Sequence, residues 1–358
     1  MPGSAPDGRG GAAPLVSVIV PCFNQGRYLT EAVESLIAQT WPHWECIIVD
    51  DGSTDDTAAV AARLAARDGR VRWVSQANRG LAGARNRGLD QARGAYLQFL
   101  DADDLLLPEK FAAQIAAAGN AGGPGVVYCR TLFRLENGGA EDSAIAPFMR
   151  LDEARPRHSL AARWEDGLSI PCQAFLFDAR LFREPPQRFE ESLPNHEDWE
   201  CWMRVFARGP ALYFVDRELA VYRRHPVAMS RDAVRMTAGW LAALRLQYAR
   251  SENDAGLRGV LAKRIREAER ELRRLQGTAA TGSAAHGAAA RMLRPLLGAE
   301  RVERLRRFLR REPALSAPAP PRVISARLGH RVANLLRRFF SERTVRRLRR
   351  FLRRNPGL

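Results

Sequence analysis

The stretch VSVIVPCFNQGRYLTEAVESLIAQTWPHWECIIVDD, residues 16–51, decides the fold. It opens with VSVIVPCF, a short apolar run rich in β-branched side chains, which predicts a buried strand. It closes with ECIIVDD, a second run of the same kind. Between them, apolar residues recur on one face of a helix: Leu29, Ala32, Val33, Leu36 and Ile37. Two buried strands joined by an amphipathic helix predict a β-α-β unit.

The same alternation continues beyond residue 51. VRWVSQA (71–77) predicts a third strand and AYLQFLDADD (95–104) a fourth, with helical segments between them. Such alternation predicts an α/β fold with a mainly parallel, doubly wound sheet flanked by helices. Later predicted elements are strands at 126–133 and 168–177, a helix within 193–209, and a strand pair in 211–230.

Pairs of carboxylates follow two of these strands. Asp50 and Asp51 end the second strand, and Asp101 and Asp103 follow the fourth. Because ligands of doubly wound sheets bind beyond the carboxyl ends of the strands, we expect these acids to share one crevice. Two carboxylates on alternate residues of a loop can hold Mg²⁺ or Mn²⁺, which prefer oxygen ligands. Acids after strands also cap helices or form turns, and we favour that interpretation for Asp55, Asp56 and Asp104.

Charge is divided unevenly along the chain. The net charge of +16 arises from 25 Lys and Arg against 30 Asp and Glu in residues 1–230, and 31 against 10 in residues 231–358. A mildly acidic globular part therefore precedes a strongly basic tail. No apolar run approaches the ~20 residues of a membrane-spanning helix. The five cysteines show no CxxC spacing, which predicts buried, reduced thiols in a cytosolic protein.

These changes of composition predict four regions. Residues 1–14 are polar and small and lack an apolar signal core, so we expect a disordered lead-in and no secretion. Residues 15–230 form the α/β domain, and residues 231–276 form a helical extension. Residues 277–358 contain linkers and basic amphipathic helices.

The basic tail contains a repeated unit. VERLRRFLRREP (302–313) recurs as VRRLRRFLRRNP (345–356), and RVANLLRRFF (331–340) carries an apolar stripe beside its arginines. Because a stripe of Leu and Phe needs an apolar host, we expect these helices to lie on an anionic membrane surface. Phosphate contacts to nucleic acid are an alternative that this stripe disfavours. Packing on the α/β domain or on a partner protein is a second alternative.

Four stretches, in order along the chain, resemble family 2 glycosyltransferases, which have the GT-A fold. They are the opening stretch continued to Thr57, then residues 78–104, then HEDWECWMR (196–204) and YRRH (222–225). The resemblance covers roughly residues 15–230. It implies transfer of a sugar from a nucleotide diphosphate donor to an acceptor hydroxyl, with inversion at the anomeric carbon.

The resemblance also implies a site. Asp101-Ala102-Asp103 matches the DxD motif, with Asp103 as the direct ligand of a divalent metal, Mn²⁺ or Mg²⁺, and His225 matches a residue that reaches the metal or the leaving diphosphate. Asp198 matches the catalytic base. The donor-binding positions implied are Pro21, Phe23, Asp50, Asp51, Arg85, Asp101 and Ala102. On the acceptor side we place Glu197, Trp199 and Trp202; core packing is the alternative for the two tryptophans, and a helix-dipole role is the alternative for the acids. The segment EPPQRFEES (184–192) departs from the family's usual Gly-Gly-Phe-Asp-like stretch.

The chemistry of such a transfer agrees with these roles. A departing nucleotide diphosphate gathers negative charge, which a metal stabilises, and a sugar hydroxyl needs a carboxylate to take its proton. We therefore expect a metal-dependent, inverting, hexosyltransferase-type enzyme of bacterial surface glycan synthesis, acting on a saccharide or lipid-linked acceptor. We expect it in the cytoplasm, peripheral to the inner face of the membrane. The alternative function is a non-catalytic nucleotide-sugar or glycan-binding protein that keeps the GT-A fold.

Overall fold

The computed structural model describes residues 13–119, 124–135, 150–225 apart from 165, 167 and 169, and 232–297, with side chains as far as 277. The chain divides into two units, Met1–Leu272 and Arg273–Leu358. Of the second unit, the described residues 273–297 all belong to helix α9 (Ala255–Leu297). The repeated basic units of the tail, and all but the last two residues of the predicted lead-in, lie outside the described residues.

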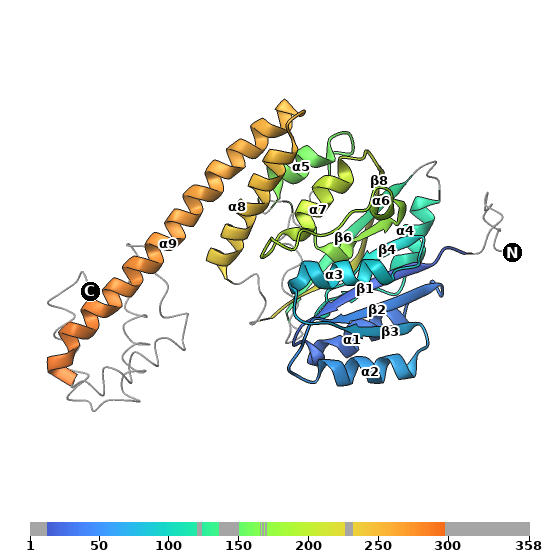
Figure 1. Ribbon diagram of the computed structural model, residues 1–358, viewed down its shortest axis with the longest axis horizontal. Coiled ribbons are helices and arrows are strands. Elements are labelled where there is room, and N and C mark those ends of the chain that lie inside the picture. Colours follow the sequence, from blue (N-terminus) through green and yellow to red (C-terminus); the bar gives the residue numbers. More distant parts are fainter. Residues whose placement is uncertain are drawn as a thin grey trace. The chain divides into compact units, whose positions relative to one another are not determined.

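An eight-stranded sheet in the order β3-β2-β1-β4-β7-β6-β8-β5 forms the centre of the first unit (Figure 1). The pairs β3–β2, β2–β1, β1–β4 and β6–β8 are parallel, and the other neighbouring pairs are antiparallel. The predicted α/β fold is confirmed, with a mixed sheet whose first four strands are parallel. The strands are β1 (Val16–Cys22), β2 (Trp44–Asp50), β3 (Val71–Ser75), β4 (Tyr96–Phe99), β5 (Leu105–Leu106), β6 (Gly125–Leu135), β7 (Phe175–Asp178) and β8 (Ala211–Arg224).

Helices cover both faces of the parallel half of the sheet. The chain moves outward from β1 to β3 through α1 (Gly26–Ile37) and α2 (Thr57–Arg67), then returns to β4 through α3 (Gly80–Gln91). Because crossovers are right-handed, the return places α3 on the face opposite α1 and α2, as Figure 1 shows. The remaining helices before α9 are α4 (Lys110–Ala118), α5 (Pro156–Arg163), η1 (Cys172–Ala174), α6 (Arg180–Arg183), α7 (Glu197–Phe206) and α8 (Ala233–Arg250).

Burial follows the predicted pattern in the first β-α-β unit. Every residue of β1 is buried, as expected for a strand covered on both faces. On α1 the predicted apolar face is buried at Leu29, Ala32, Val33 and Leu36, while Ile37 is half-buried. Removing this apolar surface from water provides the main driving force for the fold.

Helix α3 lies unusually close to β1 because of Gly88. A Cβ atom built at Gly88 would meet Cγ2 of Ile19 at 2.3 Å, a distance that packed atoms do not adopt. Glycine therefore permits the approach of the helix to the strand. Arg85 lies three residues earlier on the same helix, so this packing also sets the position of its side chain.

Three predicted elements differ from the structure. The strand expected at 168–177 is shorter: Pro171 precedes the single turn η1, and β7 covers only Phe175–Asp178. Proline lacks the N–H that a strand donates, which explains the break. The expected strand pair after residue 211 is one strand, β8, in which residues 216, 217 and 219 have no partner on β6 because the register shifts there. The linker expected from residue 277 continues α9 to Leu297, consistent with the helix propensity of its alanines.

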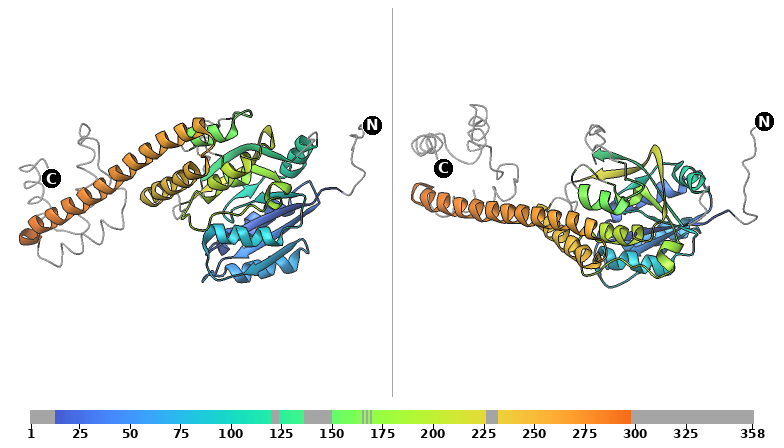
Figure 2. Two further views of the ribbon diagram at one scale, coloured as in Figure 1. Left: turned by 45° about the horizontal axis from the view of Figure 1, so that its top comes forward. Right: turned by 90° about the horizontal axis from the view of Figure 1, so that it is seen from above.

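Helices α5 and α8 pack beside α7. Helix α7 contacts both α5 and α8, and Figure 2 shows α7 and α8 side by side in both views. All five cysteines are buried and unpaired, as predicted. Among the described residues, no helix combines the length and the apolar character needed to cross a membrane.

Candidate active site

The predicted acids gather where β2, β1 and β4 end together. These strands are parallel neighbours, so their carboxyl ends lie at one edge of the sheet. Cys22, the last residue of β1, lies among the acids: burial raises the pKa of its thiol, and the charges of Asp50, Asp103 and Asp101 raise it further. The acids that follow two separate strands therefore lie close enough to act on one thiol.

Asp50 and Asp51 hold the end of β2 to the segments that follow. Asp50 accepts hydrogen bonds from the backbone N–H of Ser53, at 3.0 Å, and from the hydroxyl of Ser75, at 3.4 Å. Asp51 accepts from the side-chain amide of Gln76, at 2.8 Å, and from the backbone N–H of Arg79, at 2.9 Å. Asp50 is thereby fixed at the end of β3 and Asp51 at the start of α3, beside the predicted donor site.

Arg85 joins the two acidic motifs of the sequence. Its guanidinium donates to Oδ1 of Asp101, at 2.9 Å, and to Oε1 of Glu197 at the start of α7. Arg85 and Glu197 are almost completely buried, whereas the Asp101 side chain remains 29% exposed. Burial raises the pKa of Glu197, and the Arg85 charge opposes that rise. The DxD loop and the start of α7 are therefore held at one site by a single arginine.

Asp198 follows Glu197 in the first turn of α7. The helix begins after His196, which adopts a left-handed conformation with φ of 59°. Asp198 is partly exposed, and its charge acts on both Arg85 and the thiol of Cys172. Cys172 also lies 3.5 Å from Oδ2 of Asp101, so Asp198 lies within electrostatic range of the DxD loop. Asp198 also lies in the first turn of α7, where its negative charge interacts favourably with the helix dipole. A role as the base and a role at the helix dipole are therefore compatible.

Asp103 and His225 meet although 122 residues separate them. Nε2 of His225 lies 2.9 Å from Oδ2 of Asp103, and the side-chain amide of Gln25 donates to the same oxygen at 3.0 Å. Burial and the neighbouring charge of Asp101 raise the pKa of Asp103, and His225 opposes the rise. The side chain of Tyr28 packs against the His225 ring, with centroids 4.9 Å apart.

This donor set fits a divalent cation that substrate oxygens also hold. In the described part of the chain, no group of three or more His, Cys, Asp or Glu side chains is arranged to hold a metal unaided. His225 has a buried Nδ1 without a hydrogen-bond partner among the described residues, and Asp101 and Asp103 both keep exposed surface. Mg²⁺ is usually bound by one or two carboxylates together with water and substrate phosphates. Asp101, Asp103 and His225 fit that arrangement.

The other predicted donor positions differ in exposure. Pro21 and Ala102 are buried, so neither presents a side chain to a ligand in this structure. Phe23 follows β1 and is 48% exposed, and the other large apolar residue that is exposed among the described residues is Val234, at 37%. An exposed aromatic ring directly beyond the strand ends is placed to contact a ligand there.

Trp199 and Trp202 correct the sequence-based expectation of an acceptor role. Neither side chain has exposed surface. The ring of Trp202 stacks on Phe177, with centroids 4.4 Å apart, and Nε1 of Trp199 donates to the carbonyl of Leu160 at 3.2 Å. Both rings are part of the core, so neither offers a face to a sugar in this structure.

Several residues of the site were not singled out from the sequence. Gln25 binds Asp103, and Cys172 lies against both Asp101 and Arg85. The guanidinium of Arg223 donates to the backbone carbonyl of Asp103 and to the carboxylate of Glu31. Arg223 belongs to the YRRH motif, so the sequence could have indicated it as a site residue. No motif or spacing in the sequence distinguishes Gln25 or Cys172.

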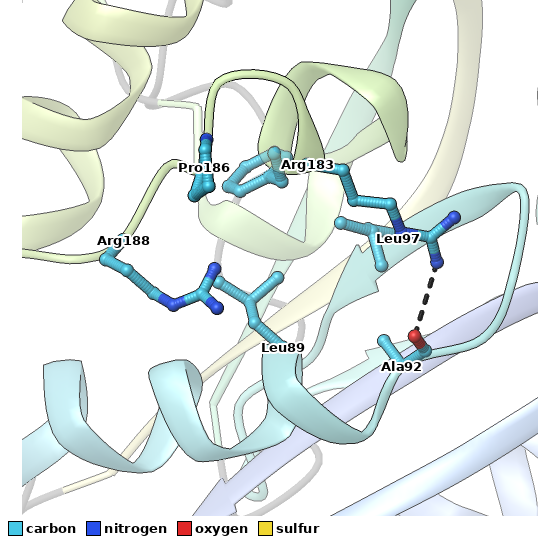
Figure 3. Close-up of a pocket in the computed structure, with 7 residues that line it drawn as sticks. Leu89, Ala92, Leu97, Arg183, Pro186 and Arg188 are labelled. Carbon is cyan, nitrogen blue, oxygen red and sulfur yellow. Dashed lines mark hydrogen bonds between the residues drawn. The ribbon is translucent and has the colours of Figure 1, made fainter.

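Two pockets lie along α3, away from these acids. A cavity of about 160 Å³ is lined by Leu89, Ala92, Leu97, Phe182, Arg183, Pro186 and Arg188. Figure 3 shows Arg183 reaching the carbonyl of Ala92, with which it forms a hydrogen bond of 3.2 Å. A neighbouring groove of about 620 Å³ shares Pro186 and Arg188, and four of its arginines form ion pairs with acids: Arg79, Arg188, Arg204 and Arg250. None of the predicted catalytic or metal residues lines either pocket.

Comparison of the sequence with known proteins gives one family. A sequence model described as Glycosyl transferase family 2 matches residues 17–177. A putative teichuronic acid biosynthesis glycosyltransferase, TuaG of Bacillus subtilis, is 44% identical over 218 residues, which are 59% of this chain and 79% of that protein. Chondroitin synthase of Escherichia coli is 43% identical over 208 residues, 55% of this chain and 27% of that protein. The chain spans only 28% of an uncharacterized glycosyltransferase of Rickettsia bellii, at 31% identity over 201 residues covering 56% of this chain.

Comparison of the structure with solved structures gives the same fold. Residues 1–349 of TarS from Staphylococcus aureus, in complex with UDP-GlcNAc, superpose with a TM-score of 0.54 at 22% identity, covering 69% of this chain and 70% of that one. A mannosyltransferase from Pyrobaculum calidifontis, in complex with GDP-Man and Mn²⁺, superposes with a TM-score of 0.51 at 20% identity, covering 77% and 75%.

Proposed function

The chain belongs to glycosyl transferase family 2, and we propose that it is a metal-dependent, inverting glycosyltransferase that moves a sugar from a nucleotide diphosphate donor to an acceptor hydroxyl. The observation that carries the proposal is the contact of Arg85 with both Asp101 and Glu197. It holds the DxD loop beside the residue that precedes the proposed base. The reaction needs both, because the diphosphate departs with its negative charge from one face of the anomeric carbon, while the acceptor hydroxyl that attacks the other face gives up its proton.

Asp198 is the proposed general base. A hydroxyl is a poor nucleophile unless a positioned group takes its proton as the new bond forms. Asp198 is partly exposed at the start of α7, where a substrate hydroxyl can reach it, while Glu197 is committed to Arg85. A single base on the face opposite the leaving group gives one displacement, and the anomeric carbon inverts.

Asp101, Asp103 and His225 are the residues proposed to hold the divalent cation. When bound, such a cation stabilises negative charge on the departing diphosphate as a Lewis acid. The described contacts of Gln25 and Arg223 with residue 103 orient that loop before substrate arrives. Phe23 and the backbone beside Asp51 lie where the donor nucleotide would bind beyond β1 and β2.

The substrates are proposed by class. Two proteins of this fold are complexed with UDP-GlcNAc and with GDP-Man, which supports a nucleotide-diphospho-sugar donor of hexosyl type. Two relatives are named for teichuronic acid and chondroitin synthesis, which supports a role in bacterial surface polysaccharide synthesis on a saccharide or lipid-linked acceptor. We place the protein in the cytoplasm, on the inner face of the membrane through its basic tail.

Donor hydrolysis tests the proposal. Purified protein is incubated with UDP-, GDP- and dTDP-sugars and Mn²⁺, and release of the nucleotide diphosphate is measured with and without EDTA. At least one donor is expected to turn over, EDTA to stop turnover, and Asp103→Ala to lose it. Asp178→Ala is the matched control, because Asp178 lies at the end of β7 and pairs with the exposed Arg180.

Absence of turnover, with nucleotide binding unchanged in Asp103→Ala, would contradict the enzyme and favour the non-catalytic binding protein. Nucleotide binding is followed by the rise in thermal stability that a ligand of the folded state produces.

A further inference from the structure

The fourth residue of the DADD sequence, Asp104, faces inward. It is 1% exposed, while Asp101 and Asp103 keep surface at the edge of the sheet. Its backbone N–H donates to the carbonyl of Asp101 at 3.0 Å, which closes the loop into a turn. Asp104 therefore belongs to the loop that we propose holds the metal, but its carboxylate is buried against other elements of the protein.

Both oxygens of Asp104 are used. Oδ1 accepts from the backbone N–H of Arg223 at 2.8 Å, and Oδ2 accepts from the side-chain amide of Gln173 at 2.7 Å. Arg223 lies on β8 and Gln173 in η1, so one carboxylate joins the loop to two elements from distant parts of the chain. The guanidinium of Arg223 also donates to the backbone carbonyl of Asp103.

Gln173 is held in turn by a buried polar chain. Its backbone carbonyl accepts from the side-chain amide of Gln98 at 3.1 Å, and Oε1 of Gln98 accepts from Nζ of Lys110 at 2.8 Å. Gln98, Lys110 and Gln173 are all completely buried. Polar groups in an apolar interior are fixed by their partners, because an unpaired group there is costly. The anchor of Asp104 is therefore rigid.

We propose that Asp104 is a positioning residue that sets the affinity of the Asp101–Asp103 loop for its divalent cation by fixing the turn before the ion arrives. The inference rests on the proposed function, in which this loop holds the ion. Groups that orient metal ligands without touching the metal change affinity by about 10- to 100-fold when altered. Asp104 would orient the metal ligands in the same way, by holding the backbone of the loop that carries them.

The test exploits the hydrogen-bond pattern. Asp104→Asn turns an acceptor into a donor, so in either orientation its NH₂ group opposes the N–H of Gln173 or of Arg223. In Asp104→Asn with Gln173→Glu, the amide of residue 104 donates to the new carboxylate at 173 and still accepts from Arg223. The exchange keeps one negative charge in the same buried pair.

Mn²⁺ binding is measured by titrating each purified full chain with Mn²⁺, alone and with UDP, and following the electron paramagnetic resonance signal of the free ion. Asp104→Asn is expected to raise the Kd for Mn²⁺ 10- to 100-fold, and the exchange to return it to within a few-fold of wild type. Asp68→Asn is the control, since Asp68 is a turn acid bonded to Arg70 far along the chain from the loop. Folding of each variant is checked by circular dichroism.

The outcomes separate the two proposals. If the wild-type chain binds no Mn²⁺, the proposed metal dependence fails. If it binds and Asp104→Asn binds equally, or if the exchange restores nothing, the positioning role is overturned. Should Asp104→Asn not fold, Gln173→Met removes one donor and keeps the acid; a Kd unchanged in that variant overturns the proposal, and a raised Kd supports it.

Discussion

Arg85 and Glu197, 112 residues apart in the sequence, form an ion pair in which the two side chains are 2% and 4% exposed. The pair ties α3 to the first turn of α7 across the edge of the sheet where the acids gather. Each of these buried charges is compensated by the other, so removal of one leaves the other buried without a partner of opposite charge. The geometry of the proposed active site therefore depends on a contact that is also important for stability.

Replacing Arg85 with Met should lower the free energy of unfolding by about 3–5 kcal/mol, because Glu197 is left buried and unpaired. Urea unfolding followed by circular dichroism measures the change. Arg67→Met is the control; Arg67 pairs with Glu34 on the surface, and its removal should leave the midpoint unchanged within error. Equal midpoints for the two variants would show that the buried pair does not stabilise the fold.

Asp198→Asn should lower the rate of sugar transfer by about 10²- to 10⁴-fold, because the amide cannot take a proton from the acceptor. Donor binding, measured by thermal shift, should change little. Asp166→Asn is the control, since the Asp166 side chain is 77% exposed and pairs with Arg264 on the surface. Transfer at the wild-type rate would remove Asp198 as the base.

Trp199→Phe should weaken the fold without changing the KM for acceptor, since the indole N–H bonds Leu160 inside the core. Trp202→Ala should cost about 3–5 kcal/mol of stability, as expected for a fully buried aromatic ring. Thermal unfolding and acceptor kinetics are measured on the same preparations. A raised KM with unchanged stability would instead indicate stacking on a sugar.

Stability should rise with pH between about 8 and 10.5 through Lys110. Burial lowers the pKa of Lys110 from 10.5 to about 8, so in this window the unfolded chain binds more protons than the folded one. The free energy of unfolding then rises with pH, by at most about 1.4 kcal/mol per unit. Below pH 8 the full cost of burying the charge is present. Urea unfolding of wild type and Lys110→Met across this window gives the comparison; parallel curves would contradict it.

Truncation after residue 276 should abolish sedimentation with vesicles of anionic lipid and leave donor hydrolysis intact. The full chain carries the basic amphipathic repeats, whose arginines and apolar stripe are expected to bind such a surface together. Vesicles of zwitterionic lipid are the control, and they should retain neither form. If the truncated chain sediments as the full chain does, membrane binding does not depend on the tail.

Much of the fold could be predicted because short-range patterns determine it. The apolar runs of β1 and β2 and the stripe on α1 follow strand and helix periods, and each is found close to where it was expected. Predictions failed where one residue interrupts a pattern. Pro171 shortens the strand expected at 168–177, and the polar residues 216–218 resemble a turn yet lie within β8.

The site was predictable to the extent that its residues lie at strand ends. Asp50, Asp101 and Asp103 converge because parallel strands end together, which the alternation of elements already implies. The bond of Arg85 to Glu197 joins positions whose separation has no local signature, so only the fold reveals it. The tryptophans of α7 were ambiguous for another reason. The same aromatic residues can pack in a core or stack on a sugar ring, and only their burial in the structure distinguishes the two roles.

Gly88 gives a buried contact between α3 and β1 an influence on the chemistry of Arg85, one turn earlier on the same face of the helix. The missing Cβ lets the helix pack directly on Ile19. The distance between helix and strand in turn determines how far the side chain of Arg85, one turn earlier, can reach. An alanine there would lift the helix by the width of a methyl group, and displacements of about 1 Å can change rates on the order of 100-fold. A buried position would then decide whether Asp101 and Glu197 can both stay bonded to Arg85.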